Sequence, residues 1–140
     1  MKLWAHSAAA LPLAAGLWWA GMTPGAVAAA AGASVLVDLD HLPDYVYWRR
    51  GWGGVADFFR SNHQRRTSVI FILLHSWELL GLALAGCWLA GAPAWGWGLC
   101  LGWAYHLLWD QLSNGVPGAF YFLAYRARRG FVRSRLFSSG

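Results

Sequence analysis

The chain has 140 residues, of which 58% are hydrophobic and only 12% are charged. An ordinary soluble domain carries about twice that share of charged residues, so the composition argues against one. The length suits a single domain covering residues 1–140. Cys87 and Cys100 are too few for a disulfide framework, and their spacing does not fit a metal knuckle.

Four apolar segments follow one another along the chain, and we predict a helix for each. Their bounds are approximately 3–20, 24–40, 67–90 and 95–113. A transmembrane helix needs about 20 apolar residues, and tryptophan, of which the chain has 11, concentrates at membrane interfaces. We therefore predict an all-α integral membrane protein: about four transmembrane helices in a small bundle, with an interfacial basic loop and a basic C-terminal tail.

The first two segments are predicted to form a helical hairpin around the turn at 21–24. Small residues would let its helices pack closely, namely Gly25, Ala29, Gly32 and Ala33. A cleaved signal peptide is an open alternative, because Lys2, an apolar run and the sequence AVAAAA also fit that pattern. The single positive charge and the Gly and Pro interruptions disfavour it.

The basic residues form two islands, within 49–66 and 126–135. Positive charge marks the cytoplasmic side of a membrane helix, so both islands and Lys2 are predicted to lie in the cytoplasm. The turns at 21–24 and 91–97 carry no charge and are predicted to lie outside. In the basic loop, residues 55–60 could form a short interfacial helix.

This topology gathers the polar residues of the predicted spans at one depth, near the cytoplasmic face. His106 and Asp110 are spaced i, i+4 and so share a helix face; we expect the same of His75 and Glu78, spaced i, i+3 within the third span. The other members are His6 near the start of the first span and Asp38, Asp40 and His41 at the end of the second. Asp44 fits an ordinary turn.

A bound metal ion would compensate the negative charge of these acidic residues. Carboxylates at helix C-termini and inside a membrane are unfavourable without a cation, and the four predicted spans contain no Lys or Arg. Imidazole and carboxylate ligands suit zinc, which we favour, or manganese or iron. The candidate ligands are Asp38, Asp40, His41, His75, His106, Asp110 and His6.

The order of these motifs resembles a group of small bacterial inner-membrane proteins that are predicted metal-dependent hydrolases. The resemblance is carried by His6, DLDH (38–41), HQRRT (63–67), HS (75–76) and HLLWD (106–110). It covers most of residues 6–110 and implies an α-helical protein of the bacterial inner membrane with a metal centre. It also implies a hydrolytic activity.

The leading hypothesis is a metal-dependent hydrolase that acts on a membrane-associated ester, such as a lipid phosphate ester, at the cytoplasmic interface. Glu78 or Asp40 would take the proton of the attacking water. Arg65, Arg66 and His63 would bind the substrate or anionic lipid head groups, and no nucleic-acid partner is expected.

Two other hypotheses stay open. Intramembrane His and acidic residues also mark ion or proton pathways, although the polar residues predicted here lie on one side only. Alternatively, the metal could simply staple a structural membrane protein together.

Overall fold

The computed structural model describes residues 3–64 and 66–137, with side chains described for 8–62, 64 and 66–137. This part of the chain is helical and contains no strand, which confirms the all-α prediction. The elements are α1 (Leu3–Trp19), α2 (Pro24–Leu36), the 3₁₀ helix η1 (Val37–Asp40), α3 (His41–Arg49), α4 (Val55–His63), α5 (Trp77–Leu89), α6 (Ala94–Ser113), the 3₁₀ helix η2 (Gly118–Tyr121), α7 (Leu123–Arg128) and α8 (Arg133–Leu136).

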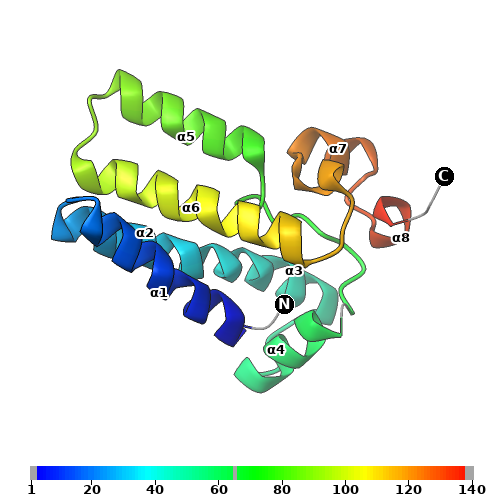
Figure 1. The fold of residues 1–140 in the computed structure, drawn as a ribbon. Helices are drawn as coiled ribbons and strands as arrows, with labels where there is room; N and C mark the ends of the chain where they lie inside the picture. The colour runs from blue at the N-terminus through cyan, green and yellow to red at the C-terminus, as the bar shows by residue number, and fades with distance from the viewer. Residues whose placement is uncertain (1–2, 65, 138–140) are drawn as a thin grey trace.

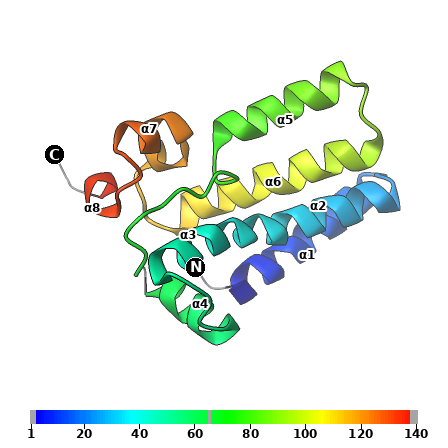
Figure 2. The same cartoon turned by 180° about the vertical axis from the view of Figure 1, so that it is seen from behind.

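Two helical hairpins lie side by side, with α2 along α6, α1 against α2, and α5 on the other side of α6 (Figures 1 and 2). The α1–α2 and α5–α6 turns are at the same end of the molecule. The short elements α3, α4, α7 and α8 gather at the opposite end. The hairpins thus place the C-terminal ends of α2 and α6 beside each other.

The close packing of α2 on α6 depends on two glycines of α6. A Cβ at Gly98 would overlap the backbone of Ala26, and one at Gly102 would overlap the backbone of Ala30. Small residues four apart allow such an approach. The prediction that Gly25 and Gly32 serve close packing is wrong, because a Cβ at either position would meet nothing within 4 Å.

One described helical run is long and apolar enough to cross a membrane. It joins α2, η1 and α3 into 26 residues, Pro24–Arg49. A core helix of a soluble protein, or a signal sequence, can have the same length and composition. The helices α1 and α5 are shorter, with 17 and 13 residues, so length and composition support one candidate span rather than four.

The prediction of a helix over 67–90 is wrong at its start, because α5 begins at Trp77. Ser76 is extended and caps the helix, since its side chain accepts a hydrogen bond from the Leu79 N–H at 3.2 Å. Residues 67–76 are apolar enough to predict a helix. Several of their backbone N–H and carbonyl groups instead form hydrogen bonds with other segments of the chain.

The segment 67–76 pairs with the chain that enters α8. Ile70 N–H donates to the Phe131 carbonyl at 2.9 Å, and Arg133 N–H donates to the Ser68 carbonyl at 2.9 Å. Gly130 and Phe131 both have positive φ angles, 65° and 58°, so the chain reverses sharply there. This pairing brings the C-terminal basic island back onto the polar end of the molecule.

Candidate metal centre

Four of the predicted ligands meet in one buried group, which we call the metal cluster: Asp38, His75, His106 and Asp110. Asp38 comes from η1, His75 from the loop before α5, and the other two from α6. One ligand atom from each residue lies within 4.8 Å of all the others. Asp38 and Asp110, which are 72 positions apart in sequence, are therefore neighbours in the structure.

Five of the six ligand-atom separations within the metal cluster fit a tetrahedral ion, and the sixth, between Asp38 and Asp110, is within 4.8 Å. His106 Nε2 lies 3.2 Å from His75 Nε2, 3.5 Å from Asp38 Oδ1 and 3.7 Å from Asp110 Oδ2. His75 Nε2 lies 3.7 Å from Asp38 Oδ1 and 3.5 Å from Asp110 Oδ2. Metal–ligand bonds of about 2.0–2.2 Å would hold tetrahedral ligand atoms about 3.3–3.6 Å apart. The group could therefore hold a metal ion.

The other ring nitrogen of each imidazole lies near an oxygen atom of another residue. His106 Nδ1 lies 2.7 Å from the Ser34 carbonyl, to which it donates, so its Nε2 presents a lone pair to the cluster. His75 Nδ1 lies 3.5 Å from Asp40 Oδ2. A carbonyl or carboxylate behind a histidine is the usual support for a metal ligand. Asp40, a predicted ligand, thus lies behind His75.

The cluster is electrostatically incomplete without a cation. Both carboxylate oxygens of Asp38 are buried and accept no hydrogen bond from the part of the chain that the structure describes. Burial lowers the pKa of His75, but attraction to the neighbouring carboxylates of Asp110, Asp38 and Asp40 outweighs burial and raises that pKa to about 10. The metal-free cluster therefore binds a proton, and a divalent ion would take its place.

Arg126 fixes the backbone that carries His75. Its side chain is fully buried, and Nη1 donates to the carbonyls of His75 at 2.7 Å and Phe120 at 2.8 Å. Nη2 donates to the Ile72 carbonyl at 3.0 Å. By sequence alone Arg126 is one member of a basic island, because nothing in its spacing points to residue 75. Its role depends on how α7 packs against the loop.

Glu78 lies in the first turn of α5, outside the metal cluster. Its carboxylate accepts hydrogen bonds from the N–H groups of Leu123 at 2.9 Å and Ala124 at 3.0 Å, at the start of α7. The prediction that His75 and Glu78 share a helix face is wrong, because His75 precedes the helix. Glu78 thus joins α5 to α7.

The remaining predicted site residues lie around the cluster or outside the described part. The His41 ring is half-buried and packs edge-on against His75, with 4.8 Å between ring centroids. Arg66 is exposed. His6 lies in α1 and His63 ends α4, but neither side chain is among those described. Arg65 also lies outside the described residues.

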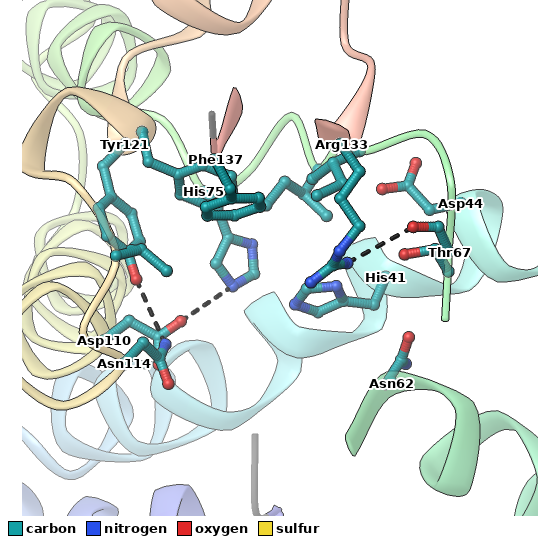
Figure 3. A pocket seen from close by; sticks show the side chains of 14 residues that line it. His41, Asp44, Asn62, Thr67, His75, Asp110, Asn114, Tyr121, Arg133 and Phe137 are labelled. Carbon is teal, nitrogen blue, oxygen red and sulfur yellow. Dashed lines mark hydrogen bonds and ion pairs between the residues drawn. The ribbon is translucent and has the colours of Figure 1, made fainter. Parts of the chain in front are cut away.

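A cavity of about 90 Å³ adjoins the cluster on the side of His75 and Asp110. That volume admits several water molecules. Figure 3 shows Asp44 and Arg133 among its lining side chains, together with Asn62, Thr67 and Asn114. By sequence alone Asp44 fits a turn and Arg133 fits a basic tail, because both reach the cavity only through the folding of distant segments.

Comparison of the chain with protein-family models, curated proteins and solved structures yields no match. The metal cluster and the cavity beside it are therefore the features of this chain that bear on its function.

Proposed function

We propose that the protein is a membrane-embedded, metal-dependent hydrolase acting on a membrane-associated ester at the cytoplasmic interface. The observation that carries the proposal is the metal cluster itself, whose ligand atoms all lie within 4.8 Å of one another and whose His75 and Asp110 border a polar cavity. A divalent metal there would lower the pKa of water towards neutrality and polarise the ester. Zinc is favoured, with manganese or iron as alternatives.

The cavity bears on whether such a metal is catalytic. Four protein ligands close a tetrahedral shell, whereas catalysis requires a position for water or substrate, reached by expansion to five ligands. The cavity adjoins two of the four ligands, His75 and Asp110. Water and the ester can therefore approach from that side.

Asp44 is our candidate for the proton acceptor in place of Asp40 and Glu78. It lines the cavity, and its Oδ2 accepts a hydrogen bond from Phe71 N–H at 2.9 Å. Neither Asp40 nor Glu78 is among the described lining residues. The oxygen of the attacking water would bond to the acyl carbon or phosphorus, and its proton would pass to Asp44. Asp44 would then return that proton to the alkoxide released by cleavage of the ester bond.

The surface around the α1–α2 and α5–α6 turns supports the proposal that the protein lies in a membrane. Large indole rings are exposed around the two uncharged turns: Trp18 (61%), Trp19 (94%), Trp88 (76%) and Trp95 (55%). Such rings favour a membrane interface. We place α1, α2, α5 and α6 in a bacterial inner membrane, with both chain termini and the metal cluster on the cytoplasmic side.

A structural staple is a second candidate function. Its support is the closed four-ligand shell, since structural zinc sites are tetrahedral and saturated by protein ligands. In that case the ion would join η1, the loop before α5, and α6 without turning over a substrate.

The deciding experiment measures metal content of the detergent-purified protein by elemental mass spectrometry. We expect about one ion per chain in the wild type and in Asp57→Asn, and loss of it in His106→Ala and Asp38→Ala. Absence of metal from the wild type under metal-replete conditions would sink both candidate functions.

Asp44→Asn then separates a hydrolase from a staple. We expect it to keep its metal and to lose most ester hydrolysis, about a hundredfold or more, because general-base catalysis contributes on that order. A wild type that holds metal but hydrolyses neither carboxylic nor phosphate esters would favour the staple.

A further inference from the structure

The wall of the cavity opposite the metal cluster carries a cation. Among the lining side chains that the structure describes, Arg133 is the one Arg or Lys, and Asp44 and Asp110 are the acids. In Figure 3 the Arg133 side chain extends from α8 towards His41, between His75 and Thr67. The cavity therefore has the candidate metal position on one side and a guanidinium on the other.

Arg133 is held in place by the fold rather than lying free on the surface. Its N–H donates to the Ser68 carbonyl at 2.9 Å, and its neighbour Val132 forms a bridge with Val69. The guanidinium donates through Nη1 to the Thr67 carbonyl at 3.5 Å and stacks over the Phe137 ring at 5.3 Å. This orientation comes from the backbone, so the charge stays at the cavity.

A second hydrogen-bond donor lines the cavity and has no acceptor among the described residues. Asn62 lines the same space, and its Nδ2 is buried without a hydrogen-bond partner among the described residues. A buried amide N–H that donates no hydrogen bond is unfavourable unless a ligand accepts from it. Water or a small anion could do so, and the nearby guanidinium favours the anion.

We infer that this cavity is a binding site for a phosphoryl group, with Arg133 and Asn62 as donors on the side away from the metal. A guanidinium pairs with phosphate through a planar fork of N–H groups, and about 90 Å³ suits one such group rather than an acyl chain. The inference rests on the proposed hydrolase and narrows its substrate class to phosphate esters. The basic residue that recognises the anion is then Arg133, instead of Arg65 or Arg66.

The test titrates inorganic phosphate into the detergent-purified, zinc-loaded full chain by calorimetry. We expect Arg133→Met to weaken phosphate binding about 10- to 100-fold, because a charge-assisted hydrogen bond is lost. Arg133→Lys should recover part of the affinity but not all, since an ammonium lacks the fork. Arg128→Met removes the same charge from an exposed position on α7 and should bind phosphate like the wild type.

The outcomes separate this inference from the proposed function. If Arg133→Met binds metal and phosphate as the wild type does, the phosphoryl site is overturned while the metal centre stands. If the wild type holds no metal, the proposed hydrolase fails. The same phosphate titration then still decides the site, which stands only if binding requires Arg133. Metal content and thermal unfolding of each variant establish that it is folded.

The source of the phosphoryl group is decided by a competition arm. Micelles doped with phosphatidic acid, compared with micelles doped with phosphatidylcholine, are added during the phosphate titration. Glycerol phosphate is added in a parallel titration. Displacement of inorganic phosphate by phosphatidic acid alone assigns the site to a lipid head group, and displacement by glycerol phosphate alone assigns it to a soluble ester. If inorganic phosphate, phosphatidic acid and glycerol phosphate all fail to bind, the inference is overturned.

Discussion

His75 is the residue on which the candidate site converges. Its Nε2 faces His106, Asp38 and Asp110, and its carbonyl is held by Arg126. The residue belongs to no helix, so its position depends on hydrogen bonds from several other segments. The same surroundings that could hold a metal also hold a proton on this ring.

Competition between proton and metal predicts a pH dependence. The pKa of His75 is raised to about 10, so the metal-free protein keeps this proton at neutral pH, and the ion must displace it. Lower pH favours the proton, so zinc affinity should rise about tenfold per pH unit between about pH 6 and 8. Titration against a chromophoric chelator at several pH values measures it, with the protonation of the chelator corrected separately.

A zinc affinity that is flat over this range would contradict the prediction. It would mean that His75 is already unprotonated in the metal-free protein. The raised pKa also implies that the metal-free fold gains stability from this proton below the pKa of an unfolded histidine, near 6.5, and loses that gain as pH rises towards 10.

At the scale of elements, the contact between α2 and α6 sets the geometry of the metal cluster. Ser34 on α2 receives the Nδ1 hydrogen bond of His106 on α6, at 2.7 Å. Gly98 and Gly102 allow the two backbones to approach closely enough for that bond. Asp38 follows directly after α2, so the same packing places its carboxylate.

Gly102→Ala is therefore expected to damage both the fold and the metal centre. The added Cβ would overlap the Ala30 backbone, and such overpacking costs about 1–3 kcal/mol. Thermal unfolding in detergent should show the loss of stability, and zinc affinity should fall with it. Gly81→Ala is the matched control, because a Cβ there meets nothing within 4 Å on exposed α5. Equal behaviour of the two variants would refute the role of this packing.

At the scale of the whole molecule, the two ends differ in chemistry. The α1–α2 and α5–α6 turns lie at one end, and the short helices α3, α4, α7 and α8 lie at the other (Figure 1). The two turns are uncharged and have exposed tryptophans around them, whereas the opposite end has the two basic islands and the cavity beside the metal cluster. This polarity is what a protein that crosses a membrane, with its metal cluster at the cytoplasmic face, would need. The single long run Pro24–Arg49 is weak support by itself, so the orientation requires a direct test.

Reporter fusions in bacterial cells test the topology. Alkaline phosphatase, which is active only outside the cytoplasm, should be active when inserted in the 91–93 turn and inactive when fused after residue 140. A green fluorescent reporter at the C-terminus should be bright. Inactive alkaline phosphatase at both positions, with the protein in the soluble fraction, would overturn the membrane placement and leave the metal cluster to be explained in a soluble protein.

Several features could be predicted from hydropathy and spacing. The apolar runs indicate α1, α2 and α6 with bounds close to those observed, and the i, i+4 spacing of His106 and Asp110 indicates a shared face because both lie within one helix. Residues 67–76 could not be predicted in this way. Hydropathy does not detect that Asp44 and Asp40 accept hydrogen bonds from backbone N–H groups of this segment, or that Arg126 donates hydrogen bonds to its carbonyls.

The sequence by itself determined the helical character and the types of ligand available, because both follow from local composition and spacing. Tertiary structure alone decided which four of those ligands meet, since η1, the loop before α5, and α6 converge only through the packing of α2 on α6. It also decided that Arg133 and Asp44 face one cavity with His75. That juxtaposition arises because the C-terminal segment pairs with residues 68–70, a contact between chain segments more than sixty residues apart that no local pattern encodes.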